Sequence, residues 1–337
     1  MSNVAEKPIV VAGAGSIGCF VGGLLAAAGR NVTLLARRRV IDEIHANGLH
    51  LTSLEGGDWR VAASAIGLTE DPAAMAGAKI VLVTVKSLDT AAMADLIAAH
   101  APADAVIVSL QNGVDNVPLL RERLPGRRVL AGMVPFNVVS MGGGHVHRAT
   151  SGDIVLERDD ADTAAQLSVP GLAITSSDRM ADVQWGKLLF NLNNAINALS
   201  NLPLREQLSQ RPWRRILAAQ MAEALAALKA AGIVPRTSTP LPAALLPFVL
   251  RLPDGIFRAV AAQMLRIDPQ ARSSMWDDLQ QGRRTEIDHL QGAIIRLAAR
   301  HGLQAPLSER IVALVKAAEG MSKGSPGLNP EQIMPAR

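Results

Sequence analysis

The 337-residue sequence has no tyrosine, only 3% aromatic residues and a single cysteine, Cys19. Proteins that bind single-stranded nucleic acid stack bases on aromatic side chains, and this sequence has too few of them. One cysteine cannot form an internal disulfide, which favours a reducing, cytoplasmic location. Because Cys19 falls inside an apolar segment, we expect a small core residue rather than a reactive thiol.

Charge of one sign is not concentrated anywhere in the chain. The 34 Lys and Arg residues only slightly outnumber the 30 Asp and Glu residues, and the basic residues are scattered. This distribution argues against a nucleic-acid surface and is compatible with a small anionic ligand. Metal-ligand spacing is also missing, because His145 and His147 have no third ligand nearby, so we expect no metal site.

The longest uncharged run, residues 9–29, is long enough to be considered as a membrane span or a secretory signal. Glycine turns interrupt it early, Glu6 offsets Lys7, and a β-like segment at 31–35 follows at once. No other part of the sequence has a membranous composition. We therefore expect a globular protein, with 49% hydrophobic and 19% charged residues, that does not cross a membrane.

The same run contains a dinucleotide-binding pattern. An apolar strand at 9–12 leads into G-A-G-S-I-G and then a helix to about Ala28, which satisfies G-x-G-x-x-G in its required setting. The first glycine permits the tight turn, the second lets the backbone approach a pyrophosphate, and the third lets the helix lie close to the strand. We assign the whole turn to the cofactor: Gly13, Ala14, Gly15, Ser16, Ile17 and Gly18.

Arg37 follows the second predicted strand, 31–35. In NAD-binding members of this fold an acidic residue near this point holds the ribose 2′-hydroxyl, whereas an arginine accommodates a 2′-phosphate. The sequence therefore favours NADP(H) over NAD(H). The alternative is a solvated basic strand end, which suits Arg38 and Arg39 better than Arg37.

Two further apolar runs, 79–85 and 105–110, predict strands buried on both faces of a parallel sheet. The first ends at Lys86 and the second leads into Asn112. Ligands bind beyond the carboxyl ends of such strands, although each residue alone could be an ordinary strand end or turn. Glycine-rich turns predict hairpins at 49–62 and around 142–144, the latter with arms near Val138 and at 145–155.

Strand-like runs give way to helical periodicity after residue 177. We predict an α/β protein with a Rossmann-like domain at 1–177 and an all-helical domain at 178–337. On a helix at 185–199, Lys187, Asn191 and Asn194 form one polar stripe, which is costly to bury unless a polar ligand meets it. A solvent-facing stripe is the alternative, but asparagine is a poor helix former.

The rest of the second domain is predicted from helix start and stop signals. Helices are expected at 212–231, 294–299 and 308–318, with a further helix starting at Ser273. The proline-rich stretch 240–264 is expected to form several short helices, and the tail from Met321 to be loose.

Six motifs in order resemble the ketopantoate reductases (2-dehydropantoate 2-reductases) over nearly the whole length. They are GAGSIG, Arg37, VTVK ending at Lys86, LQNG containing Asn112, WGKLLFN at 185–191 and SSMWDDLQQGRRTEID at 273–288. The resemblance implies NADPH-dependent reduction of 2-dehydropantoate to pantoate, in pantothenate biosynthesis on the coenzyme A pathway.

The same resemblance implies a role for each matching residue. Lys187 would be the general acid, and Glu286 would bind the substrate hydroxyl and help orient the lysine. Arg37 would bind the 2′-phosphate and Lys86 the cofactor or substrate. Polar groups near substrate and nicotinamide would be Asn112, Asn191 and Ser274, and we add Asn194 as a substrate-binding candidate from the polar stripe. The family's second helix asparagine is Ala195 here, and either Asn194 or Asn197 could replace it.

Several alternatives stay open from the sequence. Residues 235–253 form a longer proline-rich stretch than usual, which could be a lid or a contact in a possible homodimer. The expected partner is a small 2-keto acid, but the enzyme could reduce another 2-keto acid or an opine-type substrate. A non-catalytic NADP-binding sensor is the alternative from a different class.

Overall fold

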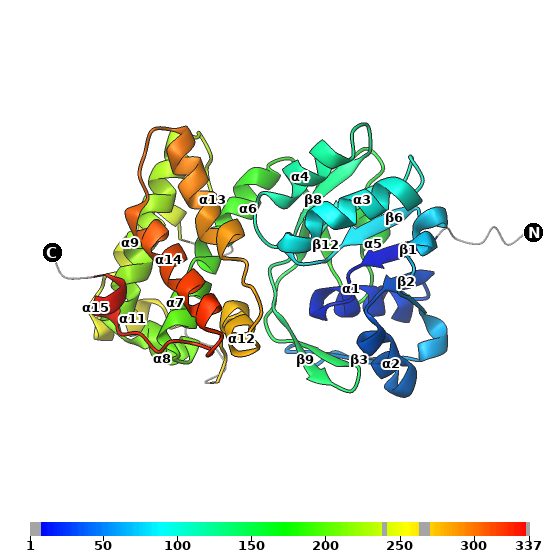
Figure 1. Cartoon of the computed structure of the whole chain (residues 1–337), viewed down its shortest axis with the longest axis horizontal. Helices are drawn as coiled ribbons and strands as arrows, with labels where there is room; N and C mark the ends of the chain where they lie inside the picture. Colours follow the sequence, from blue (N-terminus) through cyan, green and yellow to red (C-terminus); the bar gives the residue numbers. More distant parts are fainter. Residues whose placement is uncertain (1–7, 238–240, 263–269, 335–337) are drawn as a thin grey trace, which may run out of the picture. The chain divides into compact units, whose positions relative to one another are not determined.

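The structure is a computed structural model that describes residues 8–237, 241–262 and 270–334. Its internal contacts divide the chain into two compact units, Met1–Met180 and Ala181–Arg337. We call them the α/β unit and the helical unit. Figure 1 shows the chain coloured from its N-terminus to its C-terminus and labels many of the helices and strands.

The α/β unit is built on an eight-stranded sheet in the order β12-β11-β8-β7-β6-β1-β2-β5. The strands are β1 Ile9–Ala12, β2 Val32–Leu35, β5 Gly67–Thr69, β6 Ile80–Val83, β7 Val106–Ser109, β8 Val129–Met133, β11 Ile154–Glu157 and β12 Ile174–Ser177. All neighbours pair in parallel except β11 with β8. The chain moves outward in both directions from the central β1–β6 pair, which makes this pair the topological switch point.

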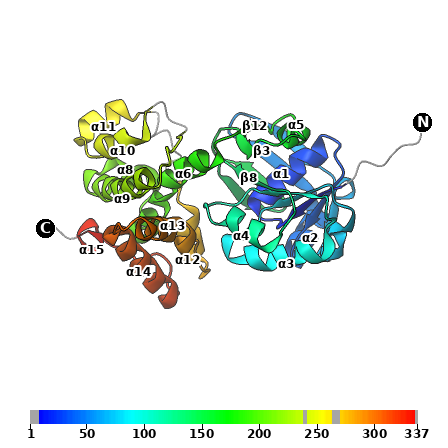
Figure 2. The same ribbon diagram turned by 90° about the horizontal axis from the view of Figure 1, so that it is seen from above.

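Helices cover both faces of this sheet, as the predicted fold class requires. They are α1 Ser16–Ala27, α2 Arg38–Asn47, α3 Thr90–His100, α4 Asn116–Arg123 and α5 Thr163–Leu167. Because crossovers between parallel strands are right-handed, α1 lies on the face opposite α3 and α4 (Figure 2). The central strands are accordingly buried on both sides, with Val10, Val81 and Ile107 fully inaccessible. The predicted doubly covered parallel sheet is confirmed.

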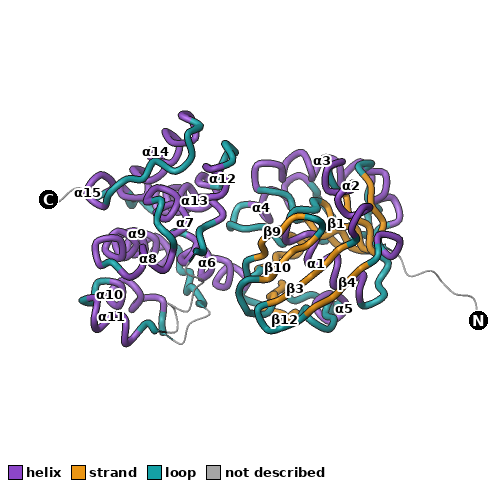
Figure 3. The backbone as a smooth tube through the Cα atoms, turned by 90° about the horizontal axis from the view of Figure 1, so that it is seen from below, coloured by secondary structure: helices purple, strands orange, loops and turns teal. Residues whose placement is uncertain are grey.

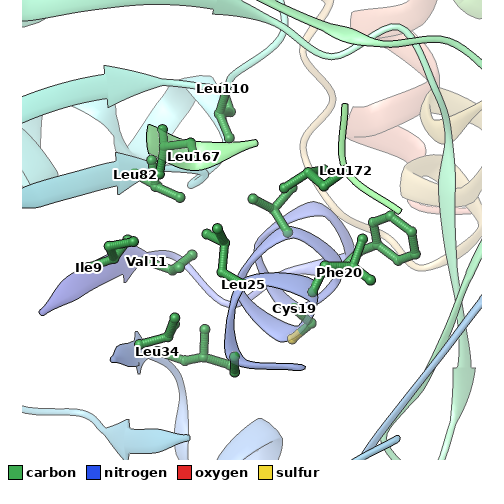
Figure 4. Close-up of a cluster of buried hydrophobic side chains, with 14 of the residues drawn as sticks. Ile9, Val11, Cys19, Phe20, Leu25, Leu34, Leu82, Leu110, Leu167 and Leu172 are labelled. Atoms are coloured by element: carbon green, nitrogen blue, oxygen red, sulfur yellow. The ribbon is translucent and has the colours of Figure 1, made fainter. Parts of the chain in front are cut away.

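A second sheet, in the order β4-β3-β10-β9, packs against α1 (Figure 3). Its strands are β3 Leu49–Ser53, β4 Asp58–Val61, β9 Val138–Gly142 and β10 His145–Arg148. Leu49 and Leu51 share one apolar cluster with Phe20 and Leu24 of α1 and with residues of the main sheet. Figure 4 shows part of this cluster, with Leu25 of α1 between side chains of the surrounding strands.

The predicted hairpin around Gly142–Gly144 is wrong in its second arm. Its 145–155 segment forms two strands, β10 in the second sheet and β11 in the main sheet. The buried Arg148 fixes the change of direction, since its guanidinium donates to the carbonyls of Thr150 and Gly152 and lies 4.5 Å from the Phe136 ring centre. The hairpin at 49–62 is confirmed as the antiparallel β3–β4 pair.

The described residues of the helical unit contain no strand. Its helices are α6 Met180–Asn191, α7 Asn193–Ser200, α8 Leu204–Ser209, α9 Arg211–Ala230, α10 Leu246–Leu250, α11 Asp254–Val260, α12 Ser274–Gln280, α13 Ile287–Arg300, α14 Pro306–Met321 and α15 Pro330–Ile333. Short 3-10 segments connect several elements in both units, such as Ser87–Asp89 and Ala243–Leu245. Prolines divide the 241–262 stretch into short helices as predicted, whereas residues 240, 263 and 264 lie outside the described ranges.

Two predictions for this unit need correction. The helix at 185–199 is interrupted at Leu192, which separates α6 from α7. The tail is also not loose throughout, because α15 has a capping box at Asn329 and buries Ile333 completely. Arg310 holds it by donating to the carbonyls of Gln332 and Ile333.

Arg214 of α9 anchors the α8–α11 region from a fully buried position. Its guanidinium donates to the carbonyls of Leu208, Ser209, Leu250 and Leu252, at 2.8–3.1 Å, and to the Asp254 carboxylate at 2.8 Å. A buried cation is tolerated only with such complete hydrogen bonding. In the described part of the chain, none of the helices has the length and apolar character needed to span a bilayer.

Candidate active site

The glycine turn between β1 and α1 is shaped by close backbone packing. Gly13 has φ +110°, and a Cβ there would lie 2.7 Å from the backbone nitrogen of Val85. A Cβ on Gly18 would collide with the carbonyl oxygen of Gly13, an oxygen that also accepts a 2.5 Å hydrogen bond from Thr84. The first and third glycines are therefore required by the turn and by helix–strand packing, as predicted.

Gly15 has a different reason to be glycine. It precedes α1 with an ordinary φ of −79°, and a Cβ there would meet no atom within 4 Å. The packing of the described residues therefore does not require glycine at this position. The first turn of α1 begins with Ser16 and Ile17, and its N–H groups have no intrahelical acceptors. Open space beside a twelve-residue helix N-terminus fits an approaching phosphate group.

Arg37 stands at the N-cap of α2, directly after β2 and Ala36. Its side chain is 90% exposed, and its guanidinium lies 3.9 Å from Asp89. Arg38 and Arg39 instead pair within α2, with Asp42 at 2.9 Å and Glu43 at 3.1 Å. All three arginines are exposed, and they differ in that Arg38 and Arg39 pair within α2 whereas Arg37 points to a residue outside it.

Lys86 and Asn112 follow neighbouring strands of the sheet and belong to adjacent loops. Lys86 is exposed and precedes the 3-10 turn Ser87–Asp89, while Asn112 is partly buried after β7. Ser87 donates to the Asn112 carbonyl at 3.4 Å, which joins the two loops. The glycine turn, through Gly13 and Val85, lies beside the first of them.

Sequence reasoning missed the buried polar network that holds these loops. Asn116, only 3% exposed, donates to Ser87 at 3.0 Å and to the Asn112 carbonyl at 2.6 Å, and accepts from Thr90 at 2.8 Å. Gln111, 7% exposed, donates to Thr90 at 2.7 Å and to the Val85 carbonyl at 3.0 Å. Both residues belong to the LQNGVDN motif that contains Asn112. They were not predicted to be buried, because polar residues that follow a strand usually form an exposed turn.

In the helical unit, Lys187 and Glu286 are brought together. Lys187 lies on α6, and Glu286 is the residue immediately before α13. Burial lowers the pKa of Lys187 to about 8, and the nearby Glu286 carboxylate opposes part of that shift. An amine with this pKa can exchange a proton near neutral pH, whereas an exposed lysine cannot.

The chain at 234–236 covers part of α6 next to Lys187. The backbone nitrogen of Arg236 donates to the Asp182 carbonyl at 2.8 Å, and Val234 donates to the Asp182 carboxylate at 3.3 Å. A Cβ on Gly186 would collide with the Arg236 carbonyl oxygen. This explains the glycine of WGK, because the close approach of 234–236 leaves no room for a side chain beside Lys187.

The asparagines near Lys187 have separate structural roles. Asn197 is fully buried, donating to Leu202 at 2.8 Å and to Gln207 at 3.1 Å and accepting from Ser273 at 2.9 Å. Asn191 and Asn194 are both partly exposed, and within the described ranges neither side chain has a hydrogen-bond partner. Asn197 is thus committed to the fold, which leaves Asn194 as the available amide. Ala195 is fully buried.

The two adjacent serines at the start of α12, Ser273 and Ser274, differ in burial and in hydrogen bonding. Ser273 is buried and is the N-cap, accepting from Trp276 at 3.2 Å and donating to the Asn194 carbonyl at 2.9 Å. Ser274 is the first residue of the helix and is exposed. The bond from Ser273 to Asn194 therefore places the start of α12, including Ser274, next to α7.

The remaining candidates from the sequence have structural roles. Cys19 is buried, burial raises the pKa of its thiol to about 12, and its sulfur donates to the Ala14 carbonyl at 3.5 Å. His145 and His147 face the same side of β10 and both bond to the Thr52 hydroxyl, at 2.9 and 2.7 Å. The described ranges contain no group of three His, Cys, Asp or Glu residues that could hold a metal ion.

Comparisons with known proteins cover both units. The family model described as ketopantoate reductase PanE/ApbA matches residues 9–160, and the model of its C-terminal region matches 179–319. A 2-dehydropantoate 2-reductase of Halobacterium salinarum is 30% identical over 320 residues, covering 92% of this chain and 98% of its own length.

Solved structures agree with these matches. The PanE/ApbA family ketopantoate reductase from Ralstonia eutropha JMP134 has 32% identity and a TM-score of 0.80, covering 94% of this chain and 99% of its own. A D-mandelate dehydrogenase in complex with NADH and anilino(oxo)acetate has 20% identity and a TM-score of 0.74 over 94% of this chain and 99% of its own, which shows a common fold. From the family models and these relatives together, the chain belongs to the ketopantoate reductase family.

Proposed function

We propose that this protein uses NADPH to reduce a 2-keto acid, with 2-dehydropantoate, reduced to pantoate, as the first candidate substrate. Family membership supports a nicotinamide cofactor and a small keto-acid substrate. The observation that carries the proposal is Lys187, whose pKa is lowered to about 8 by burial and which interacts with Glu286. Such an amine can act as the acid that reduction of a ketone requires.

The proton transfer follows from the chemistry of the carbonyl group. A nicotinamide held by the α/β unit would supply the hydride that the carbonyl carbon needs, and the carbonyl oxygen would then gain negative charge. The Lys187 ammonium stabilises that developing charge and donates its proton to the oxygen, which yields the alcohol and a neutral amine. The neighbouring Glu286 carboxylate favours the protonated lysine that starts the reaction.

The carboxylate of a 2-keto acid needs hydrogen-bond donors that do not compete with the lysine. Asn191 and Asn194 offer amides on α6 and α7, and the exposed Ser274 offers a hydroxyl at the start of α12. In the α/β unit, Asn112 would supply a further amide toward nicotinamide or substrate. Neutral donors bind an anion without adding a second fixed positive charge.

The α/β unit supports the cofactor half of the proposal. The open space at Gly15 and the first turn of α1 fit the pyrophosphate, with the backbone of Ala14, Ser16 and Ile17 around it. Exposed Arg37 fits a 2′-phosphate, and exposed Lys86 fits a further anionic group. These features favour NADPH over NADH.

The choice of substrate among the 2-keto acids depends on the donors that face its carboxylate and side chain. At the position where the resemblance leads us to expect a second asparagine, this chain has the fully buried Ala195, which offers no side-chain donor. NADPH oxidation should be followed with 2-dehydropantoate and with other branched, linear and aromatic 2-keto acids. We expect the highest kcat/KM with 2-dehydropantoate, and no oxidation with any of them would contradict a reductase.

Replacing Gly15 with alanine is expected to raise the KM for NADPH about tenfold or more without lowering the thermal midpoint. The new methyl group meets no protein atom, so folding is unaffected, but it occupies the space through which a phosphate would approach the backbone. Steady-state kinetics and a thermal melt measure both effects.

Gly320→Ala is the matched control, because this glycine in α14 is equally open to an added Cβ. We expect it to leave the KM for NADPH unchanged and to stabilise the helix slightly. An unchanged KM in Gly15→Ala would place the cofactor elsewhere.

A further inference from the structure

The junction between α6 and α7 is held by a residue from α13. Leu192 keeps helical dihedral angles, φ −56° and ψ −30°, and its nitrogen still donates to the Leu188 carbonyl at 3.0 Å. Its own carbonyl accepts a 2.9 Å hydrogen bond from the Gln291 side-chain amide. A side chain of α13 is thus attached to the backbone at the point where the two helices are separated.

This contact is buried and only partly satisfies the glutamine. Leu192 and Gln291 are both completely inaccessible to solvent. The Gln291 side-chain oxygen has no hydrogen-bond partner in the described ranges. Burying an amide oxygen without a partner is unfavourable, so stability alone does not favour glutamine over an apolar residue of similar length here.

The hydrogen bond between Gln291 and Leu192 lies close along the chain to both Lys187 and Glu286. Leu192 is the fifth residue after Lys187, and Gln291 is the fifth residue after Glu286. At 1.5 Å per helical residue, each end of the bond lies about 7.5 Å along the chain from one member of the pair. The contact therefore connects the two segments that carry Lys187 and Glu286 within two helical turns of both.

We propose that Gln291 is a positioning residue, which fixes the start of α13 against the α6–α7 junction and so holds Glu286 beside Lys187. This inference rests on the proposed function and adds a residue to its machinery. Gln291 itself does not touch the reacting atoms. A shift of about 1 Å in such a pair can lower turnover by as much as 100-fold, which makes the effect measurable.

The test replaces Gln291 with methionine, which has a similar length and no hydrogen-bond donor. We expect kcat to fall about 10- to 100-fold, because Glu286 is no longer held in place. The KM for NADPH is expected to stay the same, since the proposed cofactor residues belong to the α/β unit. The thermal midpoint is expected to change little, because the substitution removes an unpaired buried oxygen together with the hydrogen bond to Leu192, and these two effects oppose each other.

Gln220→Met in α9 is the matched control. Gln220 is also fully buried in the helical unit, and neither of its side-chain polar atoms has a partner among the described residues. The same substitution there is expected to leave kcat unchanged. The rate–pH profile adds a second readout, because loss of the nearby carboxylate should move the inflection of Gln291→Met, and not of Gln220→Met, to lower pH.

Unchanged kcat in Gln291→Met, an unchanged inflection, or equal losses in both methionine variants would overturn the proposal. If Gln291→Met does not fold, Gln291→Asn decides, because it keeps the amide but is one methylene too short to reach Leu192. A wild-type protein that reduces no 2-keto acid would instead contradict the proposed function. The positioning role would then be tested by the pH dependence of the chemical acylation of Lys187, which requires no turnover. The same pH dependence in Gln291→Met and in the wild type would contradict the positioning role.

Discussion

Replacing Lys187 with methionine is expected to lower kcat by about 1,000-fold while leaving NADPH binding intact. The substitution removes the proton donor and the positive charge that meets the developing alkoxide, and general acid catalysis alone contributes about 10²- to 10⁴-fold. The protein should still fold, because methionine fills similar space and removes a buried ammonium whose pKa shows it to be unfavourably desolvated. Turnover is measured by NADPH oxidation and binding by NADPH fluorescence.

Lys316→Met is the control for this substitution. Lys316 belongs to the same unit and pairs with Asp288 at 2.8 Å, but its side chain is half exposed. We expect that variant to keep its kcat. A Lys187→Met enzyme with a near-normal rate would show that the proton comes from another group.

The rate of reduction is expected to fall as the pH rises through about 8. Lys187 donates a proton only in its ammonium form, and its lowered pKa means that this form is lost well below pH 10.5. The Glu286 carboxylate raises this pKa, so Glu286→Gln should move the inflection to lower pH as well as reduce the rate. A profile of kcat/KM for the keto acid measures both, and an inflection near 10.5 would exclude Lys187 as the acid.

The central sheet was predictable because its signals are local. The apolar runs at 80–83 and 106–108 have no polar residue to expose, and only a strand covered on both faces suits them. The glycine turn was equally clear, since Gly13 and Gly18 are required by backbone geometry that any sequence of this fold must satisfy. The Lys187–Glu286 pair was different, because its members lie 99 positions apart in the sequence and only the family resemblance connected them.

Elements that depend on distant contacts were missed. The period of 3.6 continues through Leu192, so nothing in the 185–199 segment indicates the junction that its carbonyl forms with Gln291. The 145–155 segment was predicted as a single hairpin arm although Ser151, Gly152 and Asp153 are turn-forming residues. The contacts of Arg148 show where the chain leaves one sheet for the other. Helix α2 was not predicted, and only its first residues, Arg38 and Arg39, were considered, as a basic strand end.

The choice between Asn194 and Asn197 shows what a structure adds to a matched motif. The sequence placed Asn194, and not Asn197, on the polar stripe of Lys187, while either could replace the missing second asparagine. Asn197 connects Gln207, Leu202 and Ser273, so its amide is fully used inside the fold. Asn194 has only its backbone carbonyl committed, to Ser273. Burial and hydrogen bonding, which are tertiary properties, distinguish the two.

Replacing Arg37 with alanine is expected to lower kcat/KM for NADPH about 10- to 100-fold and to leave the value for NADH nearly unchanged. A charge-assisted hydrogen bond to a phosphate contributes about 1.5–3 kcal/mol. NADH has no 2′-phosphate, so its binding does not depend on this bond. The substitution should not lower the stability of α2, because the Arg37 side chain makes no capping hydrogen bond to this helix. Steady-state kinetics with both cofactors measure the ratio.

The neighbouring arginines provide the controls for this last comparison. Arg38 and Arg39 form ion pairs with Asp42 and Glu43 inside α2, so Arg38→Ala and Arg39→Ala should affect both cofactors slightly and equally. The preference for NADPH over NADH should also depend on ionic strength, because salt screens the attraction between the 90% exposed guanidinium of Arg37 and a 2′-phosphate. Preference for NADPH in the wild-type enzyme should therefore decrease as salt is added. Equal losses for NADPH and NADH in Arg37→Ala would mean that this residue supports the loop rather than recognising the 2′-phosphate.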